Sequence, residues 1–264
     1  MSDSKPTTRV TVLGSTTVVP GADQDTACLL LNDDHLIDTG WNAAINMLRH
    51  GGDPLLVDYL FITHCHHDHY IGLPQLLFVQ AMQRARREGR PPLTVIGPRP
   101  DIAMVVERAL HFLRSEQFPG AVVVPNVVPL QAGESFRTSR FEVTTAPTIH
   151  PVVGLCYRFT DLTTGATLAV TGDTAYLPSL ADHVRGVDLL VHEASRGACA
   201  SHTNERSGHS GSIDAARIAQ AAGVRQLGLI HYHTPHREKV LAAAKEVFPA
   251  TVALREGDRI ELGG

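Results

Sequence analysis

The sequence predicts an α/β protein (α+β in some classification schemes) built as a four-layered αββα sandwich, with two β-rich halves packed face to face and helices outside. Two observations predict this fold class. Apolar, β-branched runs typical of strands open the chain and then alternate with helical patterns. No low-complexity linker divides the 264 residues and no repeat of fixed period is evident, so we expect a single domain over 1–264.

Short apolar runs give the expected strands. They cover 9–14, 26–31, 35–38, 59–62, 93–97, 122–128, 141–146, 153–160, 166–171, 187–191, 226–231 and the last strands within 251–262. Two pairs flank good turn sequences, at 32–34 and 161–165, and are predicted hairpins.

Five helices are expected between or after these strands. They cover 42–50, 74–88, 101–114, 212–222 and 237–248. Pro74 stands in the first turn of the second helix, where proline is favoured, and Gly223 ends the fourth. Four arginines on or just after the second helix are interpreted as a solvated helix face, with a phosphate or RNA contact as the alternative: Arg84, Arg86, Arg87 and Arg90.

Composition limits the partners and the compartment. A net charge of −4 and a pI of about 6.4 argue against broad, non-specific nucleic-acid binding. No run approaches a transmembrane span and no signal peptide is visible, so we expect a cytoplasmic protein without a membrane partner. The four cysteines form no C-x-x-C pair and are expected to be reduced, with Cys65 a bystander.

One motif organises the chain. The buried strand 59–62 ends in His64-x-His66-x-Asp68-His69, which places four ligand-type side chains within six positions. Packing does not explain such a cluster, because burying unpaired polar groups is costly. Imidazole and carboxylate together suit zinc, manganese or iron, so the motif predicts a metal site.

Other polar residues stand at the ends of predicted strands. His150, Asp173 and His231 each follow an apolar run and could project towards a common edge of the fold. Asp38, in L-I-D-T-G, is either a hydrogen-bonding partner of a ligand histidine or a turn and helix-capping residue.

These motifs bring a resemblance into view. The chain resembles the metallo-β-lactamase superfamily, and within it the ribonuclease Z-like branch, over nearly its whole length. The resemblance depends on six segments in order: I-T-H-C-H-H-D-H-Y-I-G-L-P, T-I-H-P-V-V-G-L-C-Y-R, T-G-D-T, V-H-E-A-S, G-H-S-G-S-I-D-A-A-R-I-A and L-G-L-I-H-Y.

The resemblance implies a metallo-β-lactamase fold and a dinuclear centre with two Zn2+ per chain, Mn2+ or iron being used by some members. One cation would be held by His64, His66 and His150, and the other by Asp68, His69 and His231, with Asp173 bridging. A metal-bridging hydroxide would attack the substrate and Asp68 would orient it. His209 would donate a proton to the leaving oxygen, with Glu193 orienting its ring.

The sequence also departs from bacterial ribonuclease Z. Only 23 positions separate His150 from Asp173, which leaves room for one hairpin and not for the long tRNA-binding arm. The expected activity is therefore hydrolysis of small or cyclic phosphodiesters by a phosphoric diester hydrolase, and RNA is a less favoured substrate. His233 would lie on the face of His231 if that strand continued, and could then contact substrate.

Alternatives remain open. They are a ribonuclease Z-type RNA 3′-end endonuclease, an arylsulfatase-, lactonase-, thioesterase- or β-lactamase-type hydrolase, a mononuclear iron persulfide dioxygenase, and a non-catalytic metal-stabilised protein. A homodimer is expected from the branch, although no sequence feature indicates it. Substrate choice is assigned to loops near 18–25, 112–120 and 197–207.

Overall fold

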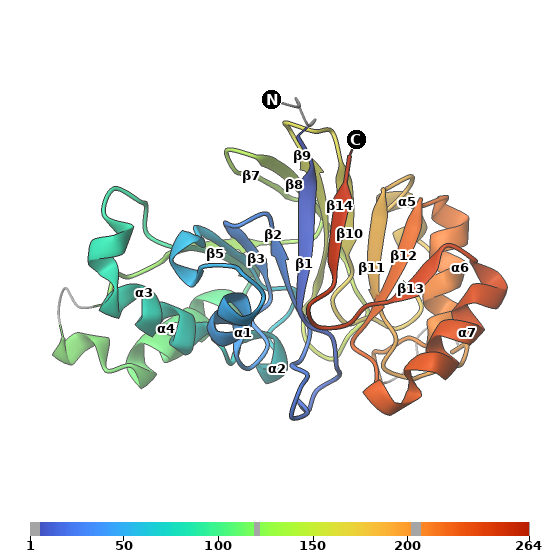
Figure 1. Ribbon diagram of the computed structural model, residues 1–264, viewed down its shortest axis with the longest axis horizontal. Coiled ribbons are helices and arrows are strands. Elements are labelled where there is room, and N and C mark those ends of the chain that lie inside the picture. The colour runs from blue at the N-terminus through green and yellow to red at the C-terminus, as the bar shows by residue number, and fades with distance from the viewer. Residues whose placement is uncertain (1–5, 119–121, 202–206, 264) are drawn as a thin grey trace.

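Two seven-stranded sheets pack face to face between two groups of helices (Figure 1). The computed structural model describes residues 6–118, 122–201 and 207–263. The predicted four-layered αββα arrangement is confirmed.

The first sheet has the order β14-β1-β2-β3-β4-β5-β6. Its strands are β1 (Thr8–Gly14), β2 (Cys28–Leu31), β3 (His35–Ile37), β4 (Tyr59–Phe61), β5 (Thr94–Pro98), β6 (Asn126–Leu130) and β14 (Arg259–Leu262). Pairing is antiparallel from β14 to β3 and parallel from β3 to β6. The first and last strands of the chain are therefore neighbours, and both termini lie at the same end of the molecule (Figure 1).

The second sheet has the order β13-β12-β11-β10-β9-β8-β7. Its strands are β7 (Ser135–Arg137), β8 (Phe141–Pro147), β9 (Leu155–Asp161), β10 (Thr167–Val170), β11 (Leu189–Glu193), β12 (Gln226–Ile230) and β13 (Thr251–Ala253). Pairing is parallel from β13 to β10 and antiparallel from β10 to β7. The predicted hairpin of β9 and β10 is present, so 150–173 carries no inserted arm.

Helices cover the outer face of each sheet. The first sheet is covered by α1 (Ala43–Arg49), α3 (Leu73–Met82) and α4 (Asp101–Phe112), and the second by α5 (Leu180–His183), α6 (Ser212–Ala222) and α7 (Arg237–Val247) (Figure 1). A single turn, α2 (His67–Tyr70), lies within the histidine motif. Short 3-10 turns occur at Pro54–Leu56, Arg84–Arg87, Ser115–Gln117 and Thr234–His236. Among the described residues, no helix is both long and apolar enough to cross a bilayer.

The core between the sheets contains closely packed aromatic rings. The ring centroid of Phe61 lies 5.0 Å from that of Phe159 and 5.5 Å from that of Tyr157. All three side chains are fully buried, and edge-to-face packing of this kind adds about 0.5–1.5 kcal/mol per pair beyond area burial. Since Phe61 is the last residue of β4, the core fixes the strand that precedes the histidine motif.

Several element boundaries were predicted wrongly. The strand expected at 122–128 begins at Asn126, because register with Thr94 of β5 sets its start and Val123 and Val124 are half or more exposed. The helix expected at 74–88 is regular only to Met82 and then tightens into a 3-10 turn. Neither β7 nor α5 was expected.

The arginines after α3 are only partly the solvated face that was expected. Arg86 is exposed and pairs with Asp53. Arg87 is buried instead, with its guanidinium donating to the Val57 carbonyl and pairing with Asp58. Arg90 also donates to Asp58, so two of the four side chains hold the loop before β4.

Candidate metal centre

Most of the predicted site residues follow strand ends at one edge of the sandwich, and His209 lies just before α6. Asp173, Glu193 and His231 come after or at the carboxyl ends of β10, β11 and β12, which are parallel neighbours. Carboxyl ends of parallel strands share an edge, and that topology brings residues distant in sequence together. In Figure 1, α2 of the histidine motif lies at the edge opposite the chain termini.

Three histidines form the first group. His64, His66 and His150 offer ring nitrogens that all lie within 4.8 Å of one another. His150 Nδ1 donates to the Gly208 carbonyl at 2.9 Å, and its Nε2 lies 2.8 Å from His66 Nδ1. The backbone bond fixes the His150 tautomer, with the Nε2 lone pair turned to the group.

A carboxylate and two histidines form the second group. Asp68, His69 and His231 also have ligand atoms within 4.8 Å of one another. Asp68 Oδ2 lies 3.1 Å from His231 Nε2 and 3.4 Å from His69 Nε2. Asp173 Oδ2 lies 3.7 Å from both His64 Nε2 and His69 Nε2, so this carboxylate stands between the two groups.

The residues fit metal ions by their unpaired atoms. His64 Nε2, His69 Nε2 and Asp173 Oδ1 are buried and have no hydrogen-bond partner. Leaving such atoms unpaired costs about 1–3 kcal/mol each, and a cation would satisfy all three. The nitrogen and oxygen donor set is the one that zinc, manganese and iron accept.

Charge is balanced inside the cluster. Burial lowers the pKa of His64, and the charge of His69 lowers it further. Burial alone would also lower the pKa of His69, but the Asp38 and Asp173 carboxylates outweigh it and raise that pKa well above its usual value. Burial opposes ionisation of Asp68, yet the hydrogen bond with His231 and the nearby ring of His69 hold its pKa below the usual range. In the metal-free cluster a proton on His69 therefore balances part of the carboxylate charge, and binding a cation would release it.

The backbone is held in a specific shape at this edge. His231 has φ +55° and Asp38 φ +54°, the left-handed region that most residues avoid. Gly172 has φ +61°, and a Cβ there would come within 2.6 Å of Thr63 Cβ. Glycine is required at 172 because the loop carrying Asp173 passes directly over the loop carrying His64.

A fourth histidine stands beside the cluster with its own carboxylate. His209 Nδ1 lies 3.0 Å from Glu193 Oε1 and 3.7 Å from Asp173 Oδ2. The His209 side chain is 27% exposed while that of Glu193 is 1% exposed. Burial opposes the charged ring, but the Glu193 bond and charge prevail and raise the pKa of His209 to about 9. The arrangement can hold a proton at the mouth of the cluster.

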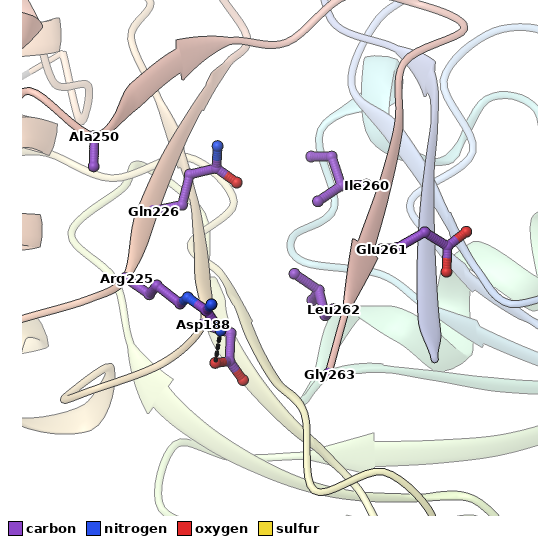
Figure 2. A pocket seen from close by; sticks show the side chains of 8 residues that line it. All are labelled: Asp188, Arg225, Gln226, Ala250, Ile260, Glu261, Leu262 and Gly263. Atoms are coloured by element: carbon purple, nitrogen blue, oxygen red, sulfur yellow. Dashed lines mark ion pairs between the residues drawn. The ribbon is translucent and has the colours of Figure 1, made fainter. Parts of the chain in front are cut away.

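The cavity in Figure 2 is a different feature. It has a volume of about 450 Å³ and lies between β12 and β14, beside the amino ends of β11 and β12. Asp188 and Arg225, which pair at 3.8 Å, contribute to its lining, and no histidine does. The cavity is therefore at the wrong end of the strands to belong to the cluster.

A family model, the beta-lactamase superfamily domain, matches residues 35–232. That match covers most of the chain and all of the clustered residues. The chain belongs to the beta-lactamase superfamily.

Individual relatives agree with this membership. The ribonuclease Z of Methanothermobacter thermautotrophicus is 28% identical over 295 residues, covering 92% of each chain. The metallo-beta-lactamase fold protein YhfI of Bacillus subtilis has a TM-score of 0.80 at 25% identity, covering 97% of this chain and 100% of its own. A diphosphatase from the PhnP family has a TM-score of 0.72 at 20% identity, covering 98% of this chain and 99% of its own, and shows the fold.

These findings confirm the predicted superfamily, its fold and the ribonuclease Z-like branch, and with them the expectation of a hydrolase. The superfamily is generally dependent on two metal ions, and this member has a histidine and aspartate cluster that could hold them. The identity of the metal is a separate question.

Sequence reasoning left Asp38 with two interpretations, and the structure favours one. Asp38 Oδ2 accepts a hydrogen bond from His69 Nδ1 at 2.8 Å, so the residue supports a histidine of the cluster. Asp25, on the loop after β1, occupies the capping role instead, because its carboxylate accepts from the Trp41 and Asn42 amides at the start of α1.

The remaining residues singled out in the sequence lie apart from the cluster. Cys65 packs against the apolar layer beneath α3 and α4, and burial raises its pKa to about 12. His192 is buried and donates to the Glu193 carbonyl. His233 is exposed, since β12 ends at Ile230 and the turn at His231 breaks the alternation that would have aligned the two histidines. His202 lies outside the described residues.

Two hydroxyl residues in the site were not expected. Thr63 Oγ1 donates to Asp38 Oδ2 at 2.8 Å, and Ser195 Oγ donates to Glu193 Oε2 at 2.6 Å. Each is next to or two positions from a predicted site residue, in I-T-H and V-H-E-A-S. This closeness in sequence was the one indication that the two hydroxyls belong to the site. It is a weak indication, because hydroxyl residues often stand near such motifs and only the fold decides which group the hydroxyl contacts.

Proposed function

We propose that this superfamily member is a phosphodiesterase that uses two metal ions to hydrolyse small or cyclic phosphodiesters. Zinc is the preferred cation, and manganese or iron would also suit the donors. His64, His66 and His150 would hold one ion and Asp68, His69 and His231 the other, with Asp173 between them.

The observation that carries this proposal is the His209–Glu193 pair beside Asp173. A phosphodiester that loses an alkoxide needs a proton at the leaving oxygen, which a histidine near the cations can supply. Glu193 accepts from His209 Nδ1, so the other ring nitrogen, Nε2, is the atom that donates. The pair therefore has the geometry of a general acid with its orienting carboxylate.

Metal ions, when bound, supply Lewis-acid charge that activates water and stabilises the developing charge on the phosphoryl group. Asp68 remains ionised beside His231 and can accept a hydrogen bond from the attacking water. His209 protonates the departing oxygen from its partly exposed position.

Hydrolysis of bis(p-nitrophenyl) phosphate by the purified protein, with bound metal quantified in the same sample, tests the proposal. We expect turnover with about two metal ions per chain, since each donor group holds one. Asp68→Ala should abolish turnover of this substrate. His209→Ala should lower turnover about 10²–10⁴-fold for a second phosphodiester with an alkoxide leaving group, because p-nitrophenolate leaves without a proton. His236→Ala, which changes an exposed histidine outside the cluster, is the control.

Other outcomes would overturn the proposal. Two bound metals without phosphodiester turnover, together with rapid turnover of a sulfate ester, a lactone or a β-lactam, would assign the site to another hydrolase class. A single bound iron would favour the alternative hypothesis that the protein is a persulfide dioxygenase.

RNA 3′-end cleavage is the second candidate, and the relation to ribonuclease Z favours it. The β9–β10 hairpin between His150 and Asp173 counts against it, because this segment has no arm that could grip tRNA. Cleavage of a pre-tRNA with a 3′ trailer, at a rate exceeding that with small diesters, would make RNA the preferred substrate. The homodimer and the cytoplasmic location expected from the sequence remain predictions.

A further inference from the structure

The hydroxyl of Ser195 lies between the Glu193 carboxylate and the His231 ring. Ser195 Oγ is 2.6 Å from Glu193 Oε2, the carboxylate that holds the proposed proton donor. It is also 2.8 Å from His231 Nδ1, on the ring assigned to the second cation. Ser195 itself is half-buried, whereas Glu193 and His231 are buried.

We propose that Ser195 is a positioning residue that sets the tautomer of His231 for metal binding and at the same time holds Glu193 for His209. This inference deepens the proposed function and rests on it. A single hydroxyl then links the cation site to the proton donor.

The direction of the hydrogen bonds follows from counting protons. A serine hydroxyl has one hydrogen and can accept from other donors. Its possible acceptors are Glu193 Oε2 at 2.6 Å, His231 Nδ1 at 2.8 Å and the His231 carbonyl at 3.1 Å. The carboxylate is closer and charged, and hydrogen bonds to charged acceptors are roughly twice as strong.

With its proton committed to Glu193, Ser195 Oγ can only accept from His231. His231 Nδ1 therefore carries hydrogen and donates at 2.8 Å. When the ring gives up the hydrogen that Nε2 shares with Asp68 Oδ2 at 3.1 Å, the lone pair is therefore on Nε2. This is the tautomer that can bind a cation in the second group.

The hydrogen bond from the Ser195 hydroxyl also helps to fix the position of Glu193. Its Oε1 accepts from the Thr174 amide at 2.7 Å and from His209 at 3.0 Å. Its Oε2 accepts from the amide of Ser195 at 3.1 Å and from the hydroxyl of Ser195. Four donors fix both oxygens of this buried carboxylate, and one of them, the Ser195 hydroxyl, also hydrogen-bonds the ring of His231.

The test compares Ser195→Ala and Ser195→Thr with the wild-type chain, each titrated with Zn2+ against a competing chelator. We expect Ser195→Ala to weaken one of the two zinc sites about 10- to 100-fold, the range typical for partners of ligand histidines. The site of His64, His66 and His150 should keep its affinity. Ser195→Thr retains a hydroxyl and should restore the weakened site to within about threefold, a margin allowed for the added methyl group.

Ser210→Ala is the matched control. Ser210 is a buried serine beside His209 whose hydroxyl donates to the Thr174 carbonyl at 2.7 Å, with no contact to His231. Ser210→Ala should destabilise the fold slightly, because it removes this hydrogen bond, and leave both zinc affinities unchanged. Long-range 1H–15N spectra of zinc-loaded protein provide a second readout, in which the wild-type His231 ring should show a protonated Nδ1.

The outcomes separate this inference from the proposed function. Unchanged zinc affinities in Ser195→Ala, or a His231 ring protonated at Nε2, would overturn the role of Ser195 even if phosphodiesters are hydrolysed. A selective loss of one zinc site, without phosphodiester turnover by the wild-type chain, would support Ser195 and reject the activity.

Discussion

Asp38 and His69 are joined by a buried hydrogen bond of 2.8 Å between Asp38 Oδ2 and His69 Nδ1. The same carboxylate accepts from the amide of Thr63 at 2.7 Å and from its hydroxyl at 2.8 Å. Asp38 thus connects the end of β3 to the loop after β4, and it turns His69 Nε2 towards the cluster.

Replacing Asp38 with asparagine is expected to weaken metal binding about 10- to 100-fold. Asparagine tolerates the φ of +54° at this position, so the backbone strain is not increased. The asparagine side chain has one acceptor oxygen where the carboxylate has two. Its NH2 group would therefore face at least one of the three donors that Asp38 accepts from, which are the Thr63 amide, the Thr63 hydroxyl and His69 Nδ1. Chelator competition measures the effect.

Asp53→Asn provides the comparison for that experiment. Asp53 caps the Pro54–Leu56 turn through the Leu55 amide and is remote from the histidine motif. Its replacement should leave metal affinity unchanged. If both asparagine variants bind metal like the wild type, the Asp38 carboxylate has no supporting role.

Gly172→Ala should destabilise the protein much more than Gly186→Ala. The two glycines have nearly the same φ, +61° and +64°, so the cost of a left-handed alanine, about 1–2 kcal/mol, is common to both. Only at 172 would the new Cβ meet a neighbour, Thr63 Cβ at 2.6 Å, while nothing lies within 4 Å at 186. The clash adds about 1–3 kcal/mol.

Urea unfolding of both variants gives the difference directly. Gly172→Ala should also bind metal more weakly. Relief of the clash with Thr63 would move the loop that carries Asp173 away from His64. Equal free energies of unfolding for the two variants would mean that the Thr63 contact does not constrain the site.

The clustered residues could be predicted because they obey a topological rule. Polar residues directly after apolar strands meet where the strands are parallel neighbours, as at Asp173 after β10 and His231 after β12. The layer arrangement followed from the same alternation of strands and helices. Both inferences depend on strong hydrophobic patterns.

Weak patterns explain what sequence reasoning missed. Strand β7 has only three residues, two of them exposed, and gives no hydrophobic signal. The helix α5 is one turn long. The sequence does not distinguish Arg87 from its neighbour Arg86, and only the folded structure shows that Arg87 is buried. The Ser195 hydroxyl meets the His231 ring because β11 and β12 pair with Glu193 opposite Ile230, a register that composition does not encode.

Arg87→Ala is expected to cost about 3–5 kcal/mol of stability, because it leaves backbone carbonyls and a partly buried carboxylate without their donor. The Arg87 side chain is 8% exposed and donates to the Leu55, Val57 and Pro91 carbonyls. Arg86→Ala, at a side chain 62% exposed, should change stability by less than about 0.5 kcal/mol. Similar unfolding midpoints for the two variants would contradict the structural role of Arg87.

The His209–Glu193 pair predicts a pH dependence for the metal-free protein. The bond to Glu193 outweighs burial and raises the pKa of His209 to about 9, from 6.5 in the unfolded chain. A raised folded-state pKa stabilises the fold fully below pH 6.5, and the contribution is lost as pH rises through about 9. We therefore expect His209→Ala to lower the free energy of unfolding most at pH 6 and progressively less towards pH 10, as read by urea titrations in chelator. Glu193→Gln should abolish this trend, because the glutamine retains the size of the side chain but not its charge. A stability difference that is constant or grows with pH would show that His209 is not held as a cation by Glu193.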